Sequence, residues 1–135
     1  MYIKQPNDWN IRPYQHIDKY ENMIIKGYNS TIYCHARGLD FNKDYDHTKY
    51  VSDWLNIYKQ TTDPKPGDLL IFNPNESIDG LEYPLIAGLN GTALVVEDIN
   101  ANEVLLSQPS PFNPDILEYQ TIHINDISKY RFITM

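Results

Sequence analysis

The sequence predicts an α+β domain in which the helices precede the strands. In the first half of the chain, apolar residues recur every three or four positions, which is the spacing of one buried helix face. In the second half, short runs rich in β-branched residues alternate with Gly, Pro and Asn. Helices followed by strands are typical of folds with segregated layers. We therefore expect N-terminal helices packed against an antiparallel β-sheet.

The chain is expected to begin with an arm and a short helix. Residues 1–17 contain two prolines and no sustained periodicity, which indicates an extended arm or an edge strand. In Asp18–Lys26, three apolar residues recur at helical spacing before Gly27 ends the pattern.

A second helix is expected from Ser30 to Gly38. Asn29 and Ser30 are good N-caps because their side-chain oxygens can accept hydrogen bonds from the free amides of a first helical turn. Gly38 is a natural helix end because glycine enters the left-handed conformation without steric cost. Ser30 is therefore expected beside unpaired amides, at the positive end of the helix dipole.

Thr48–Gln60 carries the pattern of a third helix. Its apolar residues share one helix face: Tyr50, Val51, Trp54, Leu55 and Tyr58. A Pro- and Gly-rich turn follows at residues 61–67, and residues 73–90 are expected to form a long loop. Strands are expected at Asp68–Phe72, Thr92–Ile99, Glu103–Gln108, Leu117–Asn125 and Tyr130–Met135.

Length and composition limit the class of protein. The chain of 135 residues, 41% of them hydrophobic, suits a single globular domain over residues 1–135. Its net charge of −7 repels phosphate backbones, which argues against nucleic-acid binding. No apolar run approaches the roughly 20 residues of a membrane-spanning helix. The first residues lack the pattern of a secretory signal peptide. We therefore expect a protein made in the cytoplasm that does not insert into a membrane.

The segment from Gly27 to Gly38 resembles the nucleophile helix of the CHAP family, papain-like amidohydrolases and peptidases that cut bacterial cell walls. The family signature is Asn or Gln, then Cys-Thr-Trp-Tyr, then three residues and an Arg. This chain has Asn29-Ser30-Thr31-Ile32-Tyr33, then Cys34-His35-Ala36 and Arg37. The resemblance implies a papain-like CHAP-type fold in which Ser30 takes the place of the nucleophile and Ile32 that of the tryptophan.

The resemblance continues through the second half of the chain. Pro64-Lys65-Pro66-Gly67-Asp68 is similar to the Pro-x-x-Gly-Asp element of the family, and Gly91-Thr92-Ala93-Leu94-Val95-Val96-Glu97 to the strand that bears the catalytic histidine. Leu106-Ser107-Gln108 matches the strand whose Ser-Glu pair supplies the acidic residue that orients this histidine. Trp54 sits where the family has a helical tryptophan. The resemblance covers residues 27–108.

By this resemblance, the three catalytic positions hold Ser30, Thr92 and Gln108. A papain-like hydrolase needs a thiolate nucleophile, an imidazole that serves as base and acid, and a polar group that holds the imidazole. Serine without a base is a far poorer nucleophile than a thiolate, and threonine cannot act as the base near neutral pH. The sequence therefore predicts an inactive homologue without a cofactor, in which these three residues are a vestigial site.

Cys34 is an alternative nucleophile, because it lies one helical turn after Ser30 on the same helix face. His35 or His123 would then be the base. Against this alternative, a mid-helix cysteine lacks the free amides of a helix start, and His35 points about 100° away around the helix. A lone buried cysteine usually packs as a small apolar residue.

Four oxygen-bearing residues alternate after the second helix: Asp40, Asn42, Asp44 and Asp46. This alternation is that of a calcium-binding loop, but Tyr45 and Val51 replace the glycine and the glutamate that such a loop has at its sixth and twelfth positions. Acidic residues before a helix also stabilise its N-terminus, which makes calcium the weaker interpretation.

The resemblance implies a Gram-positive cell-wall setting, either in a bacterium or in a bacteriophage that infects one. The first hypothesis is an inactive domain that serves as a structural protein of a phage virion, such as a tail or tail-tip component. Its partners would be other virion proteins and, in the old cleft, cell-wall peptide or glycan. The second hypothesis is an active peptidoglycan hydrolase with Cys34 as nucleophile. The third is a small acidic inhibitor that binds another protein.

Overall fold

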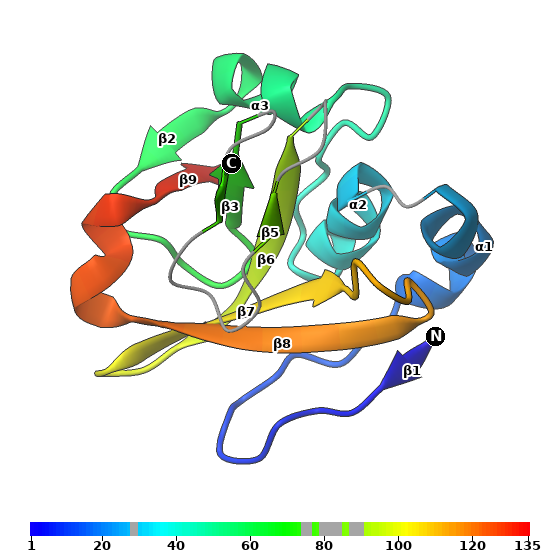
Figure 1. Cartoon of the computed structure of the whole chain (residues 1–135), viewed down its shortest axis with the longest axis horizontal. Helices are drawn as coiled ribbons and strands as arrows, with labels where there is room; N and C mark the ends of the chain where they lie inside the picture. Colours follow the sequence, from blue (N-terminus) through cyan, green and yellow to red (C-terminus); the bar gives the residue numbers. More distant parts are fainter. Residues whose placement is uncertain (28–29, 74–76, 79–84, 87–90) are drawn as a thin grey trace.

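The computed structural model describes residues 1–27, 30–73, 77–78, 85–86 and 91–135 (Figure 1). Its α-helices are α1 (Ile17–Gly27), α2 (Ser30–Asp40) and α3 (Val51–Ile57), and a 3-10 helix, η1, spans Ile124–Lys129. The strands are β1 (Tyr2–Ile3), β2 (Lys59–Thr61), β3 (Leu69–Phe72), β4 (Ser77–Ile78), β5 (Leu85–Ile86), β6 (Thr92–Ile99), β7 (Glu103–Pro109), β8 (Ile116–His123) and β9 (Arg131–Thr134). The predicted order of helices before the main strands is confirmed.

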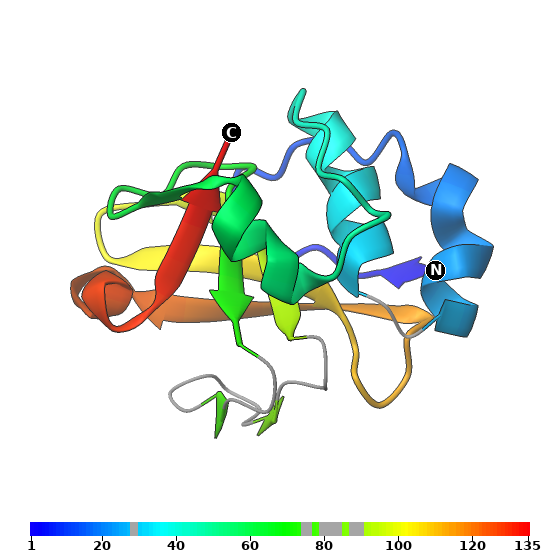
Figure 2. The ribbon, with the colours of Figure 1, turned by 90° about the horizontal axis from the view of Figure 1, so that it is seen from above.

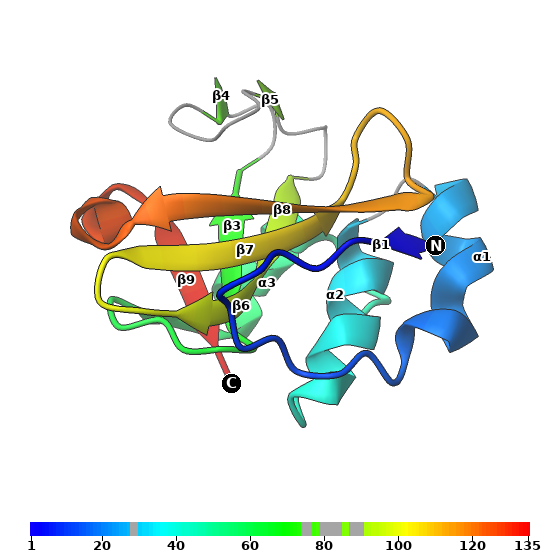
Figure 3. The ribbon, with the colours of Figure 1, turned by 90° about the horizontal axis from the view of Figure 1, so that it is seen from below.

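Seven strands form one sheet in the order β1-β8-β7-β6-β3-β9-β2, and β4 pairs separately with β5. Neighbours in the large sheet are antiparallel except β1, which pairs in parallel with β8 at one edge. Of the extended arm or edge strand expected in residues 1–17, two residues, Tyr2 and Ile3, form a strand at the edge of the sheet. Figure 3 shows the arm passing from β1 to α1. Among the helices of the described residues, none combines the length and the apolar character needed to cross a membrane.

The two faces of the sheet carry two separate apolar clusters. Ala93 and Val95 of β6 pack with α2 on one face. Leu94 and Val96, which alternate with them, belong to the second cluster on the opposite face. We call this opposite face the distal face. Its other buried members are Leu70, Phe72, Val104, Leu106, Ile122 and Phe132.

Helix α2 starts at Ser30 as predicted, but Gly38 does not end it. The helix continues to Asp40, and the left-handed residue that turns the chain is Asn42, with φ of 60°. Gly38 is needed for space instead, because a Cβ there would lie 2.7 Å from Cδ2 of Tyr45 and 2.9 Å from the backbone oxygen of Lys43. The predicted cap at Asn29 lies outside the described residues.

Helix α3 is shorter than the predicted helix over Thr48–Gln60. It ends at Ile57, where the Tyr58 amide donates to the Trp54 carbonyl and the backbone then becomes extended. The next residues form β2, which pairs with β9 at one edge of the sheet. The spacing of apolar residues in this segment does not predict a strand. The other predicted strands are confirmed apart from small differences at their ends. The exception is β8, because η1 begins at Ile124, inside the strand predicted to reach residue 125. Most of the predicted loop at 73–90 lies outside the described residues.

Trp54 is fully buried, as predicted, and replacing it with alanine is expected to cost about 3–5 kcal/mol of unfolding free energy. Its indole Nε1 donates to the Asp46 carbonyl at 3.0 Å, and its ring lies 5.7 Å from that of Tyr45. Tyr50, predicted on the same buried face, is instead 60% exposed. Tyr50→Ala is therefore the matched control in chemical denaturation. Equal losses for the two variants would contradict the assignment.

Candidate functional site

Helix α2 and strand β6 lie side by side, and this sets the place of Ser30. Cys34 Sγ lies 3.9 Å from the backbone oxygen of Ala93, and one turn later Nη2 of Arg37 lies 2.6 Å from Oε1 of Glu97. Ser30 comes one turn before Cys34, a rise of about 6 Å, so the helix start lies toward the first residues of β6. In Figure 2, α2 and β6 both begin at their lower ends in the view.

Thr92 and Gln108 both belong to the distal face of the sheet. Thr92 precedes Leu94 by two residues on β6, and Gln108 follows Leu106 by two residues on β7. Side chains two residues apart in a strand share a face. Gln108 is buried and Thr92 is half-buried. Because α2 packs on the opposite face, a cleft that Ser30 shares with them would have to lie at the ends of the strands. Such a cleft stays a prediction.

Two polar side chains of β8 lie beside Gln108 on the distal face. Glu118 is directly opposite Gln108, and Gln120 is directly opposite Leu106. Opposite residues of antiparallel strands have Cβ atoms about 4.5–5.5 Å apart. We call Thr92, Gln108, Glu118 and Gln120 the polar strip. The two β8 residues were not predicted as site residues, although their alternation along the strand was a usable signal.

Several hydrogen-bonding atoms of the polar strip are buried and have no hydrogen-bond partner among the residues that the structure describes. They are Nε2 of Gln108, Oε2 of Glu118 and both polar side-chain atoms of Gln120. Leaving such an atom unpaired costs about 1–3 kcal/mol. Folded proteins contain few such atoms, and each calls for an explanation such as a bound water, a bound ion or a catalytic role. Their grouping on neighbouring strands makes the polar strip a buried polar cluster of the distal face.

Cys34 has the surroundings of a core residue rather than of a nucleophile. Its side chain is fully buried, and this burial raises the pKa of the thiol above its ordinary value of 9.0. A raised pKa removes the thiolate on which cysteine chemistry depends. The structure therefore counts against the alternative in which Cys34 is a displaced nucleophile.

The two candidate bases, His35 and His123, have other contacts. Nδ1 of His35 donates to the Tyr45 carbonyl at 2.8 Å, and its Nε2 lies 3.2 Å from the Tyr20 hydroxyl. His123 is exposed, as predicted, and its Nδ1 accepts from the Asn125 amide at the start of η1. Both rings thus serve the packing or capping of local structure.

Two of the three carboxylates among the candidate calcium ligands, Asp40 and Asp46, are used within the protein. Asp40 is buried, with Nη1 of Arg37 2.6 Å from one oxygen and Nδ1 of His16 2.5 Å from the other. Asp46 accepts from the amide and the hydroxyl of Thr48. In the described ranges, no three His, Cys, Asp or Glu residues are grouped so that they could hold a metal ion. These contacts disfavour calcium binding at Asp40, Asn42, Asp44 and Asp46.

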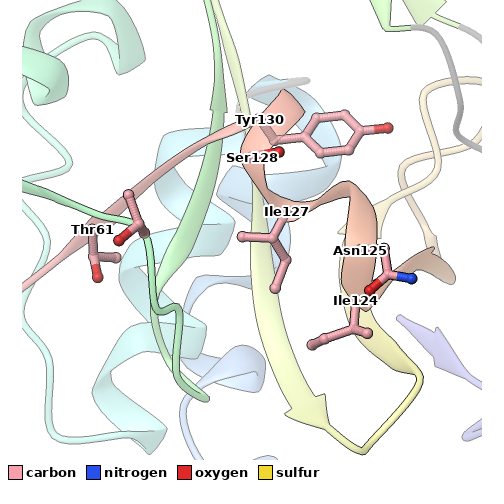
Figure 4. Close-up of a pocket in the computed structure, with 7 residues that line it drawn as sticks. Thr61, Ile124, Asn125, Ile127, Ser128 and Tyr130 are labelled. Atoms are coloured by element: carbon pink, nitrogen blue, oxygen red, sulfur yellow. The ribbon is translucent and has the colours of Figure 1, made fainter.

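A separate groove of about 380 Å³ lies between the end of β2 and η1 (Figure 4). It is lined by Thr61, Thr62, Ile124, Asn125, Ile127, Ser128 and Tyr130. These side chains include no carboxylate, imidazole, thiol or amine, so the groove lacks the groups that acid–base or nucleophilic chemistry requires. Figure 1 shows η1 at the side of the domain opposite to α1 and α2.

The fold has a counterpart among solved structures. The chain superimposes on an N-acetylmuramoyl-L-alanine amidase from Staphylococcus aureus with a TM-score of 0.67, at 18% sequence identity, over 97% of this chain. It has the fold of that amidase. The match spans 37% of the length of the amidase chain. No protein-family model matches the sequence. No curated protein matches it either.

Proposed function

We propose that this chain is a non-catalytic, CHAP-like member of the amidase fold. The proposal is carried by the residues at the three positions that correspond to the catalytic residues of the CHAP family: Ser30, Thr92 and Gln108. The helix and strands that carry them follow the order expected for that fold. None of the three supplies a thiolate or an imidazole. The cysteine of the chain is in the core, which supports the absence of a replacement nucleophile.

The purified protein is expected not to hydrolyse peptidoglycan or its peptides. A hydrolase accelerates its reaction by at least about a millionfold, and the nucleophile and base act as one unit. Release of dye from labelled cell walls is the measurement, with an active cell-wall amidase as positive control. Release of dye by the unaltered protein that is lost in Cys34→Ala would make the chain an enzyme that uses Cys34.

Two variants test the assignment of the vestigial site. Ser30→Cys alone is expected to stay inactive, because Thr92 cannot take the proton from a thiol. Ser30→Cys combined with Thr92→His is expected to restore weak hydrolysis if the old cleft is open. Reaction of the new cysteine with iodoacetamide gives a second readout, and it should be faster in the double variant, because an imidazole partner lowers the thiol pKa.

For the biological setting, we propose that the domain is a structural part of a bacteriophage virion, in the tail or tail tip, of a phage with a Gram-positive host. The amidase fold and the absence of catalytic groups together support a role in contact with other proteins or with the cell wall. Mass spectrometry of purified virions is expected to detect the chain. Its recovery only from soluble cell extract, bound to another protein, would favour the acidic inhibitor instead.

A further inference from the structure

We propose that copies of this chain associate head to tail, with the Phe112 side chain of one copy seated in the groove beside η1 of the next. The inference joins two accessible features of the domain: an exposed aromatic side chain on a fixed turn and the groove of about 380 Å³. It adds a partner, a second copy of the chain, to the virion role proposed above, and it does not depend on the lack of catalysis.

Phe112 lies in the turn that joins β7 to β8, which we call the β7–β8 turn (residues 110–115). It is 79% exposed, more than any other large hydrophobic side chain among the described residues. The buried Ser110 hydroxyl oxygen accepts from the Phe112 and Asn113 amides, both at 3.2 Å, and the Ser110 amide donates to the Ile116 carbonyl at 2.7 Å. Two prolines fix two φ angles of the turn. A ring held on such a turn loses little conformational entropy on binding, which favours a role in contact.

Other exposed apolar side chains lie at the same end of β8. Ile116 follows the turn, and Tyr2 on β1 is directly opposite Ile116 in parallel register; both side chains are exposed. Figure 3 shows the β7–β8 turn projecting away from the two strands that it joins. A single exposed apolar residue is ordinary, but several at one place are typical of an interaction site.

The groove has the chemistry to receive an aromatic ring. Its apolar members, Ile124, Ile127 and Tyr130, are partly buried and pack against the apolar cluster of the distal face. The other lining residues carry hydroxyl or amide groups: Thr61, Thr62, Asn125 and Ser128. An apolar centre combined with polar side chains is the composition of a protein–protein contact. The volume is at the lower end of the range of ligand sites, about 300–1,000 Å³, which suits one large side chain.

The turn and the groove cannot meet within one copy, because β8 separates them. Phe112 precedes the first residue of β8 and Ile124 follows its last residue, and an extended strand of eight residues spans about 24 Å. Figure 1 shows the turn near the N-terminus and η1 at the opposite end of β8. Two different surfaces of one chain that fit each other make a head-to-tail contact, which grows into a ring or an open chain of copies.

The charges beside the two surfaces have opposite signs. The β7–β8 turn ends at the exposed Asp115. Beside the groove, the exposed Lys59 shares a strand face with Thr61, and the exposed Lys129 adjoins a lining residue on each side in the sequence. Asp115 and Lys129 also have partners within the chain, the Met1 amine and Asp126. The charges therefore orient the two copies, and the apolar contact supplies most of the affinity.

Weak association is expected, because one turn in one groove is smaller than the about 1,200–2,000 Å² of a stable interface. Sedimentation velocity between about 10 μM and 1 mM should show growth beyond a dimer, with a Kd of about 0.1 mM. Phe112→Ser is expected to weaken the association by at least about tenfold, because the burial of a phenylalanine ring is lost. Tyr50→Ser removes another exposed ring and is the matched control, which should associate like the unaltered protein.

A mixing experiment tests the head-to-tail geometry. Ser128→Trp fills the groove from an exposed lining residue, as does Thr62→Trp, and each variant alone is expected to stay monomeric. An equal mixture of Phe112→Ser, which keeps the groove, and Ser128→Trp, which keeps the ring, is expected to form a dimer and to grow no further. One contact between the two variants leaves no second ring or groove available.

Three results would overturn the inference. The unaltered protein stays monomeric at about 1 mM; the association survives in both Phe112→Ser and Ser128→Trp, which would assign it to another face; or the mixture of the two variants stays monomeric. None of these results affects the proposed lack of catalysis, which depends only on dye release from cell walls, so the two proposals can fail separately.

Discussion

Arg37→Met is expected to cost about 5 kcal/mol of unfolding free energy. Arg37 is fully buried, and its guanidinium pairs with Glu97 at 2.6 Å and with Asp40 at 2.6 Å. It also donates to the backbone oxygens of Pro13 and Arg12, which attaches the N-terminal arm to α2. Its removal leaves two buried carboxylates that have lost their main cationic partner, and breaking one such pair alone costs about 3–5 kcal/mol.

Urea denaturation checks this expectation, and two comparisons sharpen it. Lys65→Met breaks an ion pair with Asp63 whose two side chains are 69% and 84% exposed, and it should cost less than about 1 kcal/mol. Adding Glu97→Gln to Arg37→Met should recover part of the loss, because a neutral side chain at position 97 needs no cation and can still hydrogen-bond to Ser107. A loss below about 1 kcal/mol for Arg37→Met would contradict the buried network.

The protein is expected to lose stability steeply above about pH 9. Burial raises the pKa of the Cys34 thiol above its ordinary 9.0, and that of the Tyr33 and Tyr45 hydroxyls above their ordinary 10.0. The second cause is Glu97 for Tyr33 and Asp68 for Tyr45, since a nearby negative charge opposes ionisation. The partly buried Tyr119 has its pKa raised, mainly by burial, to about 12.

The sign of the effect follows from proton binding. Between the unfolded and folded pKa values, the folded protein holds protons that the unfolded chain releases, so stability is full below pH 9 and falls as pH rises. Each fully buried group contributes about 1.4 kcal/mol per pH unit, and the three together remove about 5 kcal/mol by about pH 11.

Urea unfolding measured between about pH 7 and pH 11 tests this prediction. Cys34→Ala should delay the start of the loss by about one pH unit, because the remaining groups have an ordinary value of 10.0. Tyr50→Phe alters an exposed hydroxyl and should leave the profile unchanged. A stability that stays constant up to about pH 11 would mean that the buried hydroxyls and the thiol reach water.

Local sequence signals were sufficient where the structure depends on neighbouring residues. The start of α2 at Ser30 and the full extent of β6 were predicted from capping chemistry and β-branched composition. The predicted end of α2 is wrong, because Gly38 is not a left-handed residue and the helix continues to Asp40. Gly38 instead lacks a side chain because the ring of Tyr45 packs against it and leaves no room for a Cβ. This contact forms when the chain folds back after α2, and the spacing of residues in the sequence does not predict it.

Periodicity, capping and side-chain chemistry are local properties, and they are enough to predict the α+β class and to show which chemical groups stand at positions 30, 92 and 108. The pairing of Arg37 with Glu97, 60 residues away, and the place of β2 at an edge of the sheet became clear only from the folded chain. The same is true of Gln108, Glu118 and Gln120, which gather on one face with unpaired atoms. These features depend on strand register and on burial, which arise when distant segments pack and leave no signal in the spacing of neighbouring residues.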